Sequence, residues 1–287
     1  MTRSGQRTGH GALPNFLYIG PDKAGSTWLA DVLDAHPGVH VAPAKDVFFF
    51  DRYYDRGLDW YRHRIGDPAG APVVAEVCHD YLFSPAAAER IAHDLPGVRL
   101  MVTLRRPGER AFSSYLHMRK HNLYTGTFEA ALRDVDELID HGRYTSHLRP
   151  YVERFGADRI RVALFDDLVD DPQGFADGLS DWLGIDRFAL PGELRSASLP
   201  ASRPRVAFVA RNAKRAALGA RALGLPGVVG RVKRAAVVQR SLYRRFGEDR
   251  PVAEPAVLRR VDAELAAEVR GLTDLVGIDV AGRWDLA

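Results

Sequence analysis

A short segment near the N-terminus, "IGPDKAGSTWL", combines a lysine, two glycines and two hydroxyl side chains in a spacing that suits an anion. A nucleotide-binding P-loop reads G-x-x-x-x-G-K-[ST], with its lysine directly after the second glycine. Here Gly20 and Gly25 have that spacing, but Ser26 follows the second glycine and the lysine comes earlier, at Lys23. The segment connects an apolar run to an amphipathic one, and the start of a helix exposes backbone N–H groups that favour negative charge. An N-cap serine would explain the hydroxyls alone but not the lysine beside them, so the loop predicts an anion site.

A second segment, "LRRPGERAFSSY", follows the longest apolar run. Arg105 stands at the end of the predicted strand, and Ser113 lies two turns into a helix that Pro107 can begin. An arginine offers a planar fork of N–H donors that matches phosphate oxygens. Both side chains could therefore reach one phosphate. The alternative is an arginine that caps the sheet edge and a serine bonded within its own helix.

"PDKAGSTWL" resembles the 5′-phosphosulfate loop of the PAPS-dependent sulfotransferases, in which lysine, a small residue, glycine, Ser or Thr and Thr are often followed by Trp. That family transfers a sulfuryl group from 3′-phosphoadenosine 5′-phosphosulfate (PAPS) on a P-loop-like sheet. The resemblance implies that Lys23 contacts the phosphosulfate and that Trp28 lies near the adenine. The loop residues implied to cradle the 5′-phosphate are Ala24, Gly25, Ser26 and Thr27.

The second segment is similar to the 3′-phosphate motif of the same family, arginine-x-proline followed by a helix that carries a serine. This implies that Arg105 and Ser113 bind the 3′-phosphate. A third segment, "FDDLVDDPQGFADGLSDWLGI" over residues 165–185, is similar to the segment that follows the family's core sheet. With the C-terminal helix, these matches span most of the chain.

"PAKDVFFFDRYYDRGLDWY" resembles the heparan-type branch of the family and related bacterial enzymes, whose pattern is K-E-x-x-F-F followed by G-x-x-W-Y. The acidic residue after the lysine is the general base of that branch, which implies Asp46 here, with Asp in place of Glu. "AEVCHDYLF" departs further, because Val77 and His79 replace the branch's lysine and proline. His79 is the second candidate base, since a neutral imidazole suits the role near pH 7. The alternatives are a solvated loop carboxylate for Asp46 and a hydrogen-bonded strand-end residue for His79.

Sulfuryl transfer requires removal of the acceptor's proton, stabilisation of charge on the transferring group and neutralisation of the leaving phosphate oxygen. Lys23 is the candidate for the last two tasks, and Lys45 is a candidate contact to donor or acceptor. No metal ion is required, and the sequence contains no convincing metal-ligand cluster. The aromatic residues at positions 48–50, 53 and 54 could line an acceptor pocket or belong to the core.

Short apolar runs alternate with amphipathic segments over the first two thirds of the chain. Continuous apolarity is typical of parallel strands covered on both faces, and the alternation predicts an α/β fold. With the resemblance, this gives a P-loop-like parallel sheet with helices on both faces and a helical C-terminal third. The predicted strands are Phe16–Gly20, Val73–Val77, Val98–Leu104 and Ile160–Phe165. The predicted helices are Thr27–Ala35, Pro85–Asp94, Pro107–Lys120 and Phe175–Leu183, with a closing helix that ends near Gly277.

The totals suit one domain over residues 15–287 after a disordered lead, residues 1–14. The single cysteine, Cys78, fits a reducing compartment and forms no disulfide framework. We find no signal peptide or membrane span, so we expect a cytoplasmic protein. The Ala- and Arg-rich composition suggests a bacterial enzyme that acts on a metabolite.

No Asp or Glu occurs from Leu194 to Gly247, whereas Arg and Lys recur throughout. Two basic helices broken at "GLPG" are expected there. They could present a solvated basic face, or an amphipathic surface over 205–246 for anionic lipid or an acidic acceptor. "SRPR" lies where the family's late loop closes over the donor, which implies Arg203 or Arg205 as a 3′-phosphate contact. No nucleic-acid motif accompanies the charge.

The leading hypothesis is a PAPS-dependent sulfotransferase acting on a hydroxyl or amine of a small molecule, lipid or saccharide. A nucleoside or small-molecule kinase is the alternative, although it lacks the lysine after Gly25 and a convincing aspartate for Mg²⁺. A non-catalytic nucleotide-binding module with a basic surface for a membrane or partner is the third. Neither the acceptor nor the oligomeric state follows from the sequence.

Overall fold

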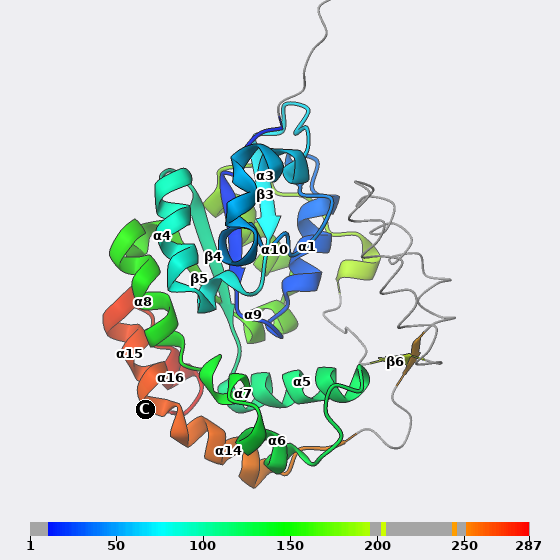
Figure 1. Ribbon diagram of the computed structural model, residues 1–287, viewed down its shortest axis with the longest axis vertical. Helices are drawn as coiled ribbons and strands as arrows, with labels where there is room; N and C mark the ends of the chain where they lie inside the picture. The colour runs from blue at the N-terminus through cyan, green and yellow to red at the C-terminus, as the bar shows by residue number, and fades with distance from the viewer. Residues whose placement is uncertain (1–10, 196–201, 205–242, 246–250, 287) are drawn as a thin grey trace, which may run out of the picture.

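The computed structural model describes residues 11–195, 202–204, 243–245 and 251–286 (Figure 1). Within them, five parallel strands form one sheet in the order β2-β3-β1-β4-β5, and β6 and β7 form a separate antiparallel pair. The α/β prediction is therefore confirmed. The strands are β1 Phe16–Gly20, β2 Val39–Val41, β3 Val73–Val77, β4 Arg99–Leu104, β5 Ile160–Leu164, β6 Ser202–Pro204 and β7 Tyr243–Arg245.

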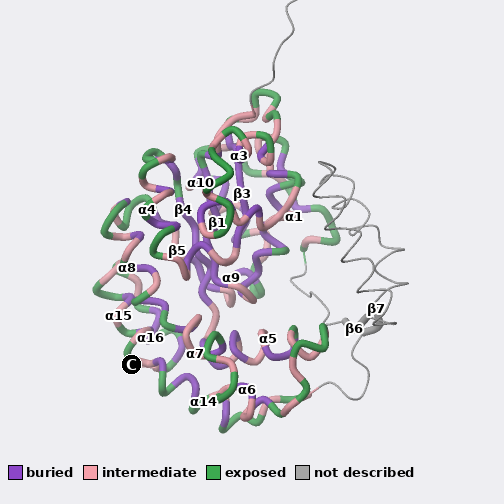
Figure 2. Tube along the Cα trace, viewed as in Figure 1, coloured by how far each residue is buried: buried purple, intermediate pink, exposed green. Residues whose placement is uncertain are grey.

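Alternate residues of the central strands face two separate cores, as the pleat of a strand requires. On β1, Leu17 and Ile19 join a core formed with α4 (Pro85–Asp94), α8 (Tyr144–Phe155) and α15 (Ala266–Val276). Phe16 and Tyr18 join a core formed with α1 (Ser26–Ala35) and α10 (Pro172–Leu183). Figure 2 shows the buried residues concentrated along the strands between these helices. This two-sided burial explains why the strands are apolar without interruption.

Helices α1 to α8 lie in the chain between β1 and β5, and α9 and α10 follow β5 (Figure 1). Their bounds are α1 Ser26–Ala35, α2 Phe49–Arg52, α3 Gly57–Ile65, α4 Pro85–Asp94, α5 Pro107–Lys120, α6 Phe128–Asp134, α7 Glu137–Asp140, α8 Tyr144–Phe155, α9 Phe165–Asp170 and α10 Pro172–Leu183. The C-terminal helices are α14 Pro255–Glu264, α15 Ala266–Val276 and α16 Val280–Arg283, and the 3₁₀ turns are η1 Tyr54–Arg56, η2 Tyr81–Phe83, η3 Ala157–Arg159 and η4 Gly192–Leu194.

Proline begins several of these helices, where its missing N–H is no loss. Pro85 and Pro107 open α4 and α5 as predicted, and the hydroxyl of Ser84 caps α4 by accepting from the N–H of Ala87 at 3.1 Å. Pro172 opens α10 three residues before the predicted start at Phe175. The predicted closing helix is divided into α14 and α15 at the buried Leu265.

Helix α5, which carries Ser113, is held at its first turn by α14. Asp262 is 3% exposed; its carboxylate accepts from the backbone N–H of Gly108 at 2.8 Å and pairs with Arg106 at 2.8 Å. A Cβ at Gly108 would lie 2.6 Å from the carbonyl oxygen of Leu258, so only glycine permits this close approach of the two helices. The start of α5 is thereby fixed relative to the sheet.

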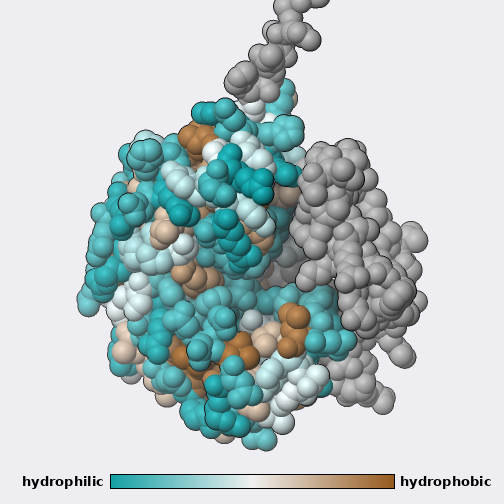
Figure 3. All heavy atoms as spheres, viewed as in Figure 1, coloured by the Kyte–Doolittle hydropathy of each residue, from teal (hydrophilic) through white to brown (hydrophobic). Residues whose placement is uncertain are grey.

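Several predictions fall wholly or partly outside the described residues. The two basic helices and Arg205 lie there, and so does most of the predicted lead, although Ala12 and Leu13 pack against the main core. Arg203 lies in β6, opposite Arg244 of β7. No described helix is long and apolar enough to cross a membrane. Hydrophilic residues dominate the face shown in Figure 3, with hydrophobic ones in small groups between them.

Candidate active site

The loops that follow the parallel strands all leave the sheet at one edge. Open α/β sheets bind ligands there, outside the carboxyl ends of the strands. Lys23 follows β1, His79 follows β3 and Arg105 follows β4. The segment after β2 reaches the same edge, because Asp46 donates its backbone N–H to the carbonyl of Val77, the last residue of β3, at 2.9 Å. The predicted site residues of four separate segments therefore meet.

The loop after β1 is the predicted strand–turn–helix connection. Gly25 has φ +93°, and a Cβ there would lie 2.9 Å from Cδ1 of Leu168 in α9, so the turn needs glycine and packs on that helix. Helix α1 begins directly after it, with Ser26 buried and Thr27 exposed. Its first N–H groups have no partner within the helix, which makes the turn suitable for a phosphate.

Lys23 carries the positive charge of this loop and adopts a left-handed backbone conformation with φ 64°. Burial, aided by the charges of Lys45, Lys120 and Arg110 and opposed by that of Asp22, lowers the pKa of its ammonium to about 8. A bound anion would favour the protonated ammonium, because a nearby negative charge raises the pKa of a lysine.

Arg105 joins this loop directly. Its Nη1 donates to the carbonyl oxygen of Lys23 at 3.4 Å, and its Nη2 lies 3.1 Å from a carboxylate oxygen of Glu109. The guanidinium also lies over the ring of Phe165, 4.5 Å from its centroid. Ser113 is half-buried two turns into α5. Arg105 therefore joins the start of the α5 segment to the loop after β1, and Glu109 is the carboxylate beside its guanidinium.

Asp46 and His79, considered separately as bases from the sequence, form a pair. Oδ1 of Asp46 lies 2.6 Å from Nδ1 of His79 and accepts from the His79 backbone N–H at 3.3 Å, while Oδ2 lies 3.5 Å from Nζ of Lys45. Burial alone would raise the pKa of Asp46, but the His79 hydrogen bond and the Lys45 charge outweigh it and lower that pKa. Asp46 is therefore held ionised.

The second ring nitrogen of His79 is also bound, because Nε2 lies 3.1 Å from Oδ1 of Asp80. Both ring nitrogens of His79 therefore already face carboxylate oxygens, one of Asp46 and one of Asp80. His79 is thus a hydrogen-bond partner of Asp46, and the two candidate bases belong to one cluster.

The aromatic run after Asp46 is divided between core and surface. Phe49 and Phe50 are fully buried, and Phe49 stacks on Tyr61 with ring centroids 4.4 Å apart, so both belong to the core. Phe48 is half-buried and meets the ring of His79 edge-on at 5.8 Å, and Tyr53 is 42% exposed. Tyr54 is half-buried like Phe48, so Phe48, Tyr53 and Tyr54 are the members of this run that stay partly accessible to an acceptor.

Trp28 lies in the core rather than beside the loop. It is 2% exposed, its ring meets that of Phe175 edge-on at 5.7 Å, and its indole N–H donates to the carbonyl oxygen of Leu194 at 2.9 Å. Stacking on an adenine would require the ring to leave these contacts. The described structure therefore does not support a stacking role for Trp28.

The sequence patterns did not single out Asp22 and Glu76, two acidic residues near the site. Asp22 precedes Lys23 and binds three side chains of the α5–α7 region. Glu76 lies fully buried within β3 and accepts hydrogen bonds from the hydroxyls of Tyr61 at 2.5 Å and Tyr81 at 2.9 Å. Burial raises the pKa of Glu76 to about 7. A single carboxylate within the apolar run "VVAEV" was the available signal for Glu76.

The single cysteine, Cys78, is free and buried. Over the ranges that the structure describes, no three His, Cys, Asp or Glu side chains are arranged to hold a metal ion.

Comparison with known proteins gives one family. The family model described as "Sulfotransferase domain" matches residues 13–197, more than half of the chain. The bifunctional heparan sulfate N-deacetylase/N-sulfotransferase 1 of Caenorhabditis elegans is 28% identical over 202 residues, which are 64% of this chain and 24% of that relative. Human heparan sulfate glucosamine 3-O-sulfotransferase 3B1 is 30% identical over 189 residues, 63% of this chain and 48% of that relative. The chain thus spans between a quarter and a half of the length of these curated relatives.

A solved structure shares the fold. The sulfotransferase from Alicyclobacillus acidocaldarius superimposes with a TM-score of 0.69 over 94% of this chain and 98% of its own, at 21% identity. This likeness concerns the arrangement of strands and helices, including the parallel sheet whose carboxyl edge holds the site.

Proposed function

Because the chain belongs to the sulfotransferase domain family, we propose that it transfers a sulfuryl group from PAPS to a hydroxyl or amine of an acceptor. One observation carries the proposal: the lysine loop and Arg105 adjoin, with Nη1 of Arg105 3.4 Å from the carbonyl oxygen of Lys23. PAPS carries negative charge at two places, its 3′-phosphate and its 5′-phosphosulfate. Two adjoining anion-binding segments at one sheet edge suit such a donor.

The donor contacts follow from the positions of the side chains. Lys23 and the turn through Ala24, Gly25, Ser26 and Thr27 would hold the 5′-phosphosulfate, where the α1 N-terminus adds N–H donors. Arg105 and Ser113 would hold the 3′-phosphate. Arg203 and Arg205 remain candidates for the same phosphate. Lys45, Lys120 and Arg110 place further positive charge around Lys23, which would attract an anionic ligand.

The transfer step requires a proton acceptor. Asp46, held ionised by His79 and Lys45, would take the proton from the acceptor's O–H or N–H. The acceptor atom then forms a bond to sulfur, and the bond from sulfur to the bridging phosphate oxygen breaks. The electron pair remains on that oxygen and leaves with adenosine 3′,5′-bisphosphate (PAP), with Lys23 neutralising the developing charge. Both residues belong to one domain that we propose extends over residues 15–287.

The proposal for the acceptor covers three chemical classes. The names of the relatives refer to heparan sulfate and its glucosamine units, and the segment that carries Asp46 resembles that branch. A saccharide is therefore one of three proposed acceptor classes, with small molecules and lipids as the others. Phe48, Tyr53 and Tyr54 are the partly accessible aromatic side chains that could contact it.

Transfer of ³⁵S from labelled PAPS tests the proposal without knowledge of the acceptor. The protein would be incubated with labelled PAPS and separate pools of amino sugars, phenols and lipid alcohols, and labelled products would be separated from PAPS. We expect PAP formation matched by one labelled product, and none with Lys23→Met. Consumption of ATP with Mg²⁺ in place of PAPS would show a kinase instead.

A further inference from the structure

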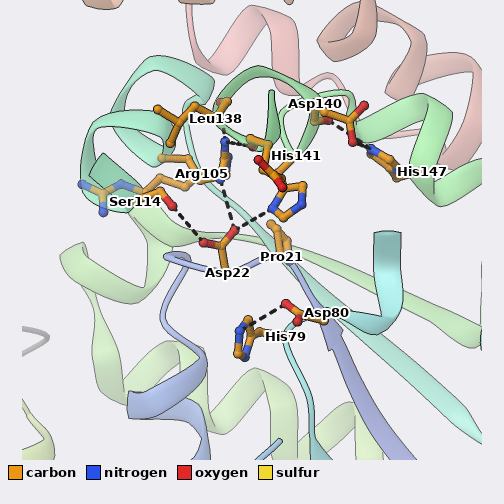
Figure 4. Close-up of polar contacts among 12 residues, drawn as sticks. Pro21, Asp22, His79, Asp80, Arg105, Ser114, Leu138, Asp140, His141 and His147 are labelled. Atoms are coloured by element: carbon orange, nitrogen blue, oxygen red, sulfur yellow. Dashed lines mark hydrogen bonds and ion pairs between the residues drawn. The ribbon is translucent and has the colours of Figure 1, made fainter. Parts of the chain in front are cut away.

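Asp22, the residue before Lys23, binds more partners than any role in the loop's turn requires. Its Oδ1 accepts from Nη1 of Arg110 at 3.1 Å and lies 3.3 Å from Nδ1 of His141. Its Oδ2 accepts from the hydroxyl of Ser114 at 3.3 Å. Arg110 and Ser114 stand on α5, and His141 directly follows α7. Figure 4 shows the side chains of Asp22, Ser114 and His141 turned toward one another.

The partners of Asp22 are themselves fixed in place. Arg110 is fully buried, and its Nη2 donates to the carbonyl oxygens of Leu138 at 2.5 Å and Glu137 at 3.3 Å. The ring of His141 stacks on that of Phe83, with centroids 3.5 Å apart. A buried guanidinium requires a nearby negative charge, so Asp22 is bound where its charge is needed.

Asp22 remains ionised in these surroundings. Burial alone would raise the pKa of its carboxyl, but the hydrogen bond with His141 and the charges of Arg110, His141 and Lys23 outweigh that effect and lower the pKa well below its usual range. The charge of Asp22 therefore favours the protonated form of the Lys23 ammonium.

The backbone of Lys23 is held from both of its ends. On the N-terminal side of Lys23, the side chain of Asp22 is bound to Arg110 and Ser114 of α5. On its C-terminal side, Arg105, which lies between β4 and α5, donates to the Lys23 carbonyl oxygen. Between them Lys23 has φ 64°, a conformation that costs a non-glycine residue of order 1 kcal/mol and persists only where the surroundings impose it. Helix α5, the proposed 3′-phosphate helix, thus also fixes the loop that would hold the phosphosulfate.

We propose that Asp22 is a positioning residue of the donor site. Its carboxylate, bound by Arg110, Ser114 and His141, holds the Lys23 backbone in place and keeps a negative charge beside the Lys23 ammonium. This inference rests on the proposed function for its consequence in donor binding. Its consequence for Lys23 itself does not depend on any donor.

The charged groups around Lys23 set the direction of the expected effect. Asp22 favours the protonated ammonium, whereas Lys45 from the loop after β2 and Arg110, His117 and Lys120 from α5 disfavour it or compete with it. Removing the charge of Asp22 leaves only the disfavouring group of neighbours, so Lys23 should lose its proton at lower pH.

The first test measures the titration of Lys23 in the ligand-free protein by trace acetylation at a series of pH values, read by mass spectrometry. In Asp22→Asn the midpoint for Lys23 should fall by roughly one pH unit, and Asp22→Glu should restore it. Asp34→Asn, an exposed aspartate of α1, is the matched control and should leave the midpoint unchanged. An unshifted Lys23 midpoint in folded Asp22→Asn would overturn the inference.

The second test measures PAP affinity by calorimetry at pH 6 and pH 8.5. Relative to the wild type, Asp22→Asn should lose roughly tenfold more PAP affinity at pH 8.5 than at pH 6. At pH 8.5 one unit of pKa separates the charged fractions of Lys23, whereas at pH 6 Lys23 is protonated in both proteins and only the loss of positioning remains. If Asp22→Asn does not fold, Ser114→Ala serves instead. It keeps the charge of Asp22 but removes one hydrogen bond to the Asp22 carboxylate, and it should weaken PAP binding by about fivefold at both pH values. Unchanged PAP affinity in Ser114→Ala would then contradict the positioning role. Failure of the wild type to bind PAP would instead contradict the proposed function, while the Lys23 titration would still decide the role of Asp22.

Discussion

We propose the Asp46 carboxylate as the base because its neighbours keep it ionised and leave it accessible. Its side chain is 20% exposed, and Oδ2 faces Lys45 while Oδ1 is bound by His79. Its backbone has φ 61°, so the conformation that presents the carboxylate is one that few non-glycine residues adopt. Strained backbone of this kind is found at functional sites, where the surrounding structure maintains it.

Replacing Asp46 with Asn should remove turnover without removing donor binding. The amide keeps the size of the side chain but cannot take a proton, so we expect PAPS turnover to fall by at least about 100-fold. PAP affinity should stay within about twofold of the wild type, because the donor contacts come from the loop after β1 and from α5. Parallel assays of turnover and PAP calorimetry check this, with Asp46→Glu as the variant that retains a base. Turnover close to that of the wild type in Asp46→Asn would assign the proton to another group.

Lys23 should make donor capture sensitive to alkaline pH. The ammonium must be protonated to bind the phosphosulfate, and burial lowers its pKa to about 8 in the ligand-free protein. The value of kcat/KM for PAPS should therefore fall as pH rises through about 8. The decline in kcat should lie at higher pH, because a bound anion favours the protonated form.

A pH series of initial rates from pH 6 to pH 10 separates these two profiles. A kcat/KM that stays constant up to pH 10 would show that the charge of Lys23 does not limit donor capture.

Strand β3 carries a buried polar cluster that supports the segment of the proposed base, Asp46. The Tyr81 hydroxyl donates to Glu76 at 2.9 Å and accepts the backbone N–H of Phe49 at 2.9 Å. Since Phe49 begins the short helix that follows the Asp46 segment, this chain of hydrogen bonds ties the base loop to the sheet. Glu76 occupies a fully buried position that normally excludes charge.

Glu76 should make stability fall as pH rises. Burial raises its pKa from an ordinary 4.5 to about 7, so between these values the folded state holds a proton that the unfolded state has lost. Stability is therefore greatest below about pH 4.5 with respect to this group and decreases up to about pH 7. The full loss is at most about 3 kcal/mol, from 1.36 kcal/mol for each pKa unit.

Urea unfolding at pH 5 and pH 8 should show this loss in the wild type and not in Glu76→Gln. Glu264→Gln, an exposed position on α14, serves as the control and should follow the wild type. An equal change with pH in the wild type and in Glu76→Gln would mean that Glu76 ionises normally.

The elements differ in how far the sequence foretells them. The long apolar runs that became β1, β3, β4 and β5 are recognisable because both of their faces are buried. Strand β2 has three half-buried residues at the sheet edge and gives no run to detect. The division of the closing helix at Leu265 depends on its packing, since the apolar spacing continues through it.

The site shows the same limit. Lys23 and Arg105 follow from local motifs, whereas the bond between Asp46 and His79 joins residues 33 positions apart and depends on how the segment after β2 pairs with β3. Asp22 directly precedes Lys23 in the sequence, but its proposed role depends on partners that the fold brings from α5 and from the end of α7. Sequence patterns identified the groups, and the fold assigned their partners.

The molecule as a whole places the two proposed anion-binding segments and the proposed base, Asp46, at one edge of the five-stranded sheet. The sheet order sets β1 between β3 and β4, so the loop with Lys23 lies between the Asp46 side and the Arg105 side. A donor bound across the ends of β1 and β4 would direct its sulfuryl group toward the ends of β2 and β3, where Asp46 lies.

The measurement that tests this account most directly is the thermal stability of the protein with PAP in the absence of metal, compared with ATP and Mg²⁺. A ligand at about 100 times its Kd stabilises the folded state by about 2.7 kcal/mol, on the order of 5 °C for a domain of this size. We expect PAP alone to raise the Tm of the wild type and of Arg154→Ala, an exposed control on α8, and to do so far less in Arg105→Ala. Stabilisation by ATP with Mg²⁺ and not by PAP would contradict the central claim and identify the loop after β1 as that of a kinase.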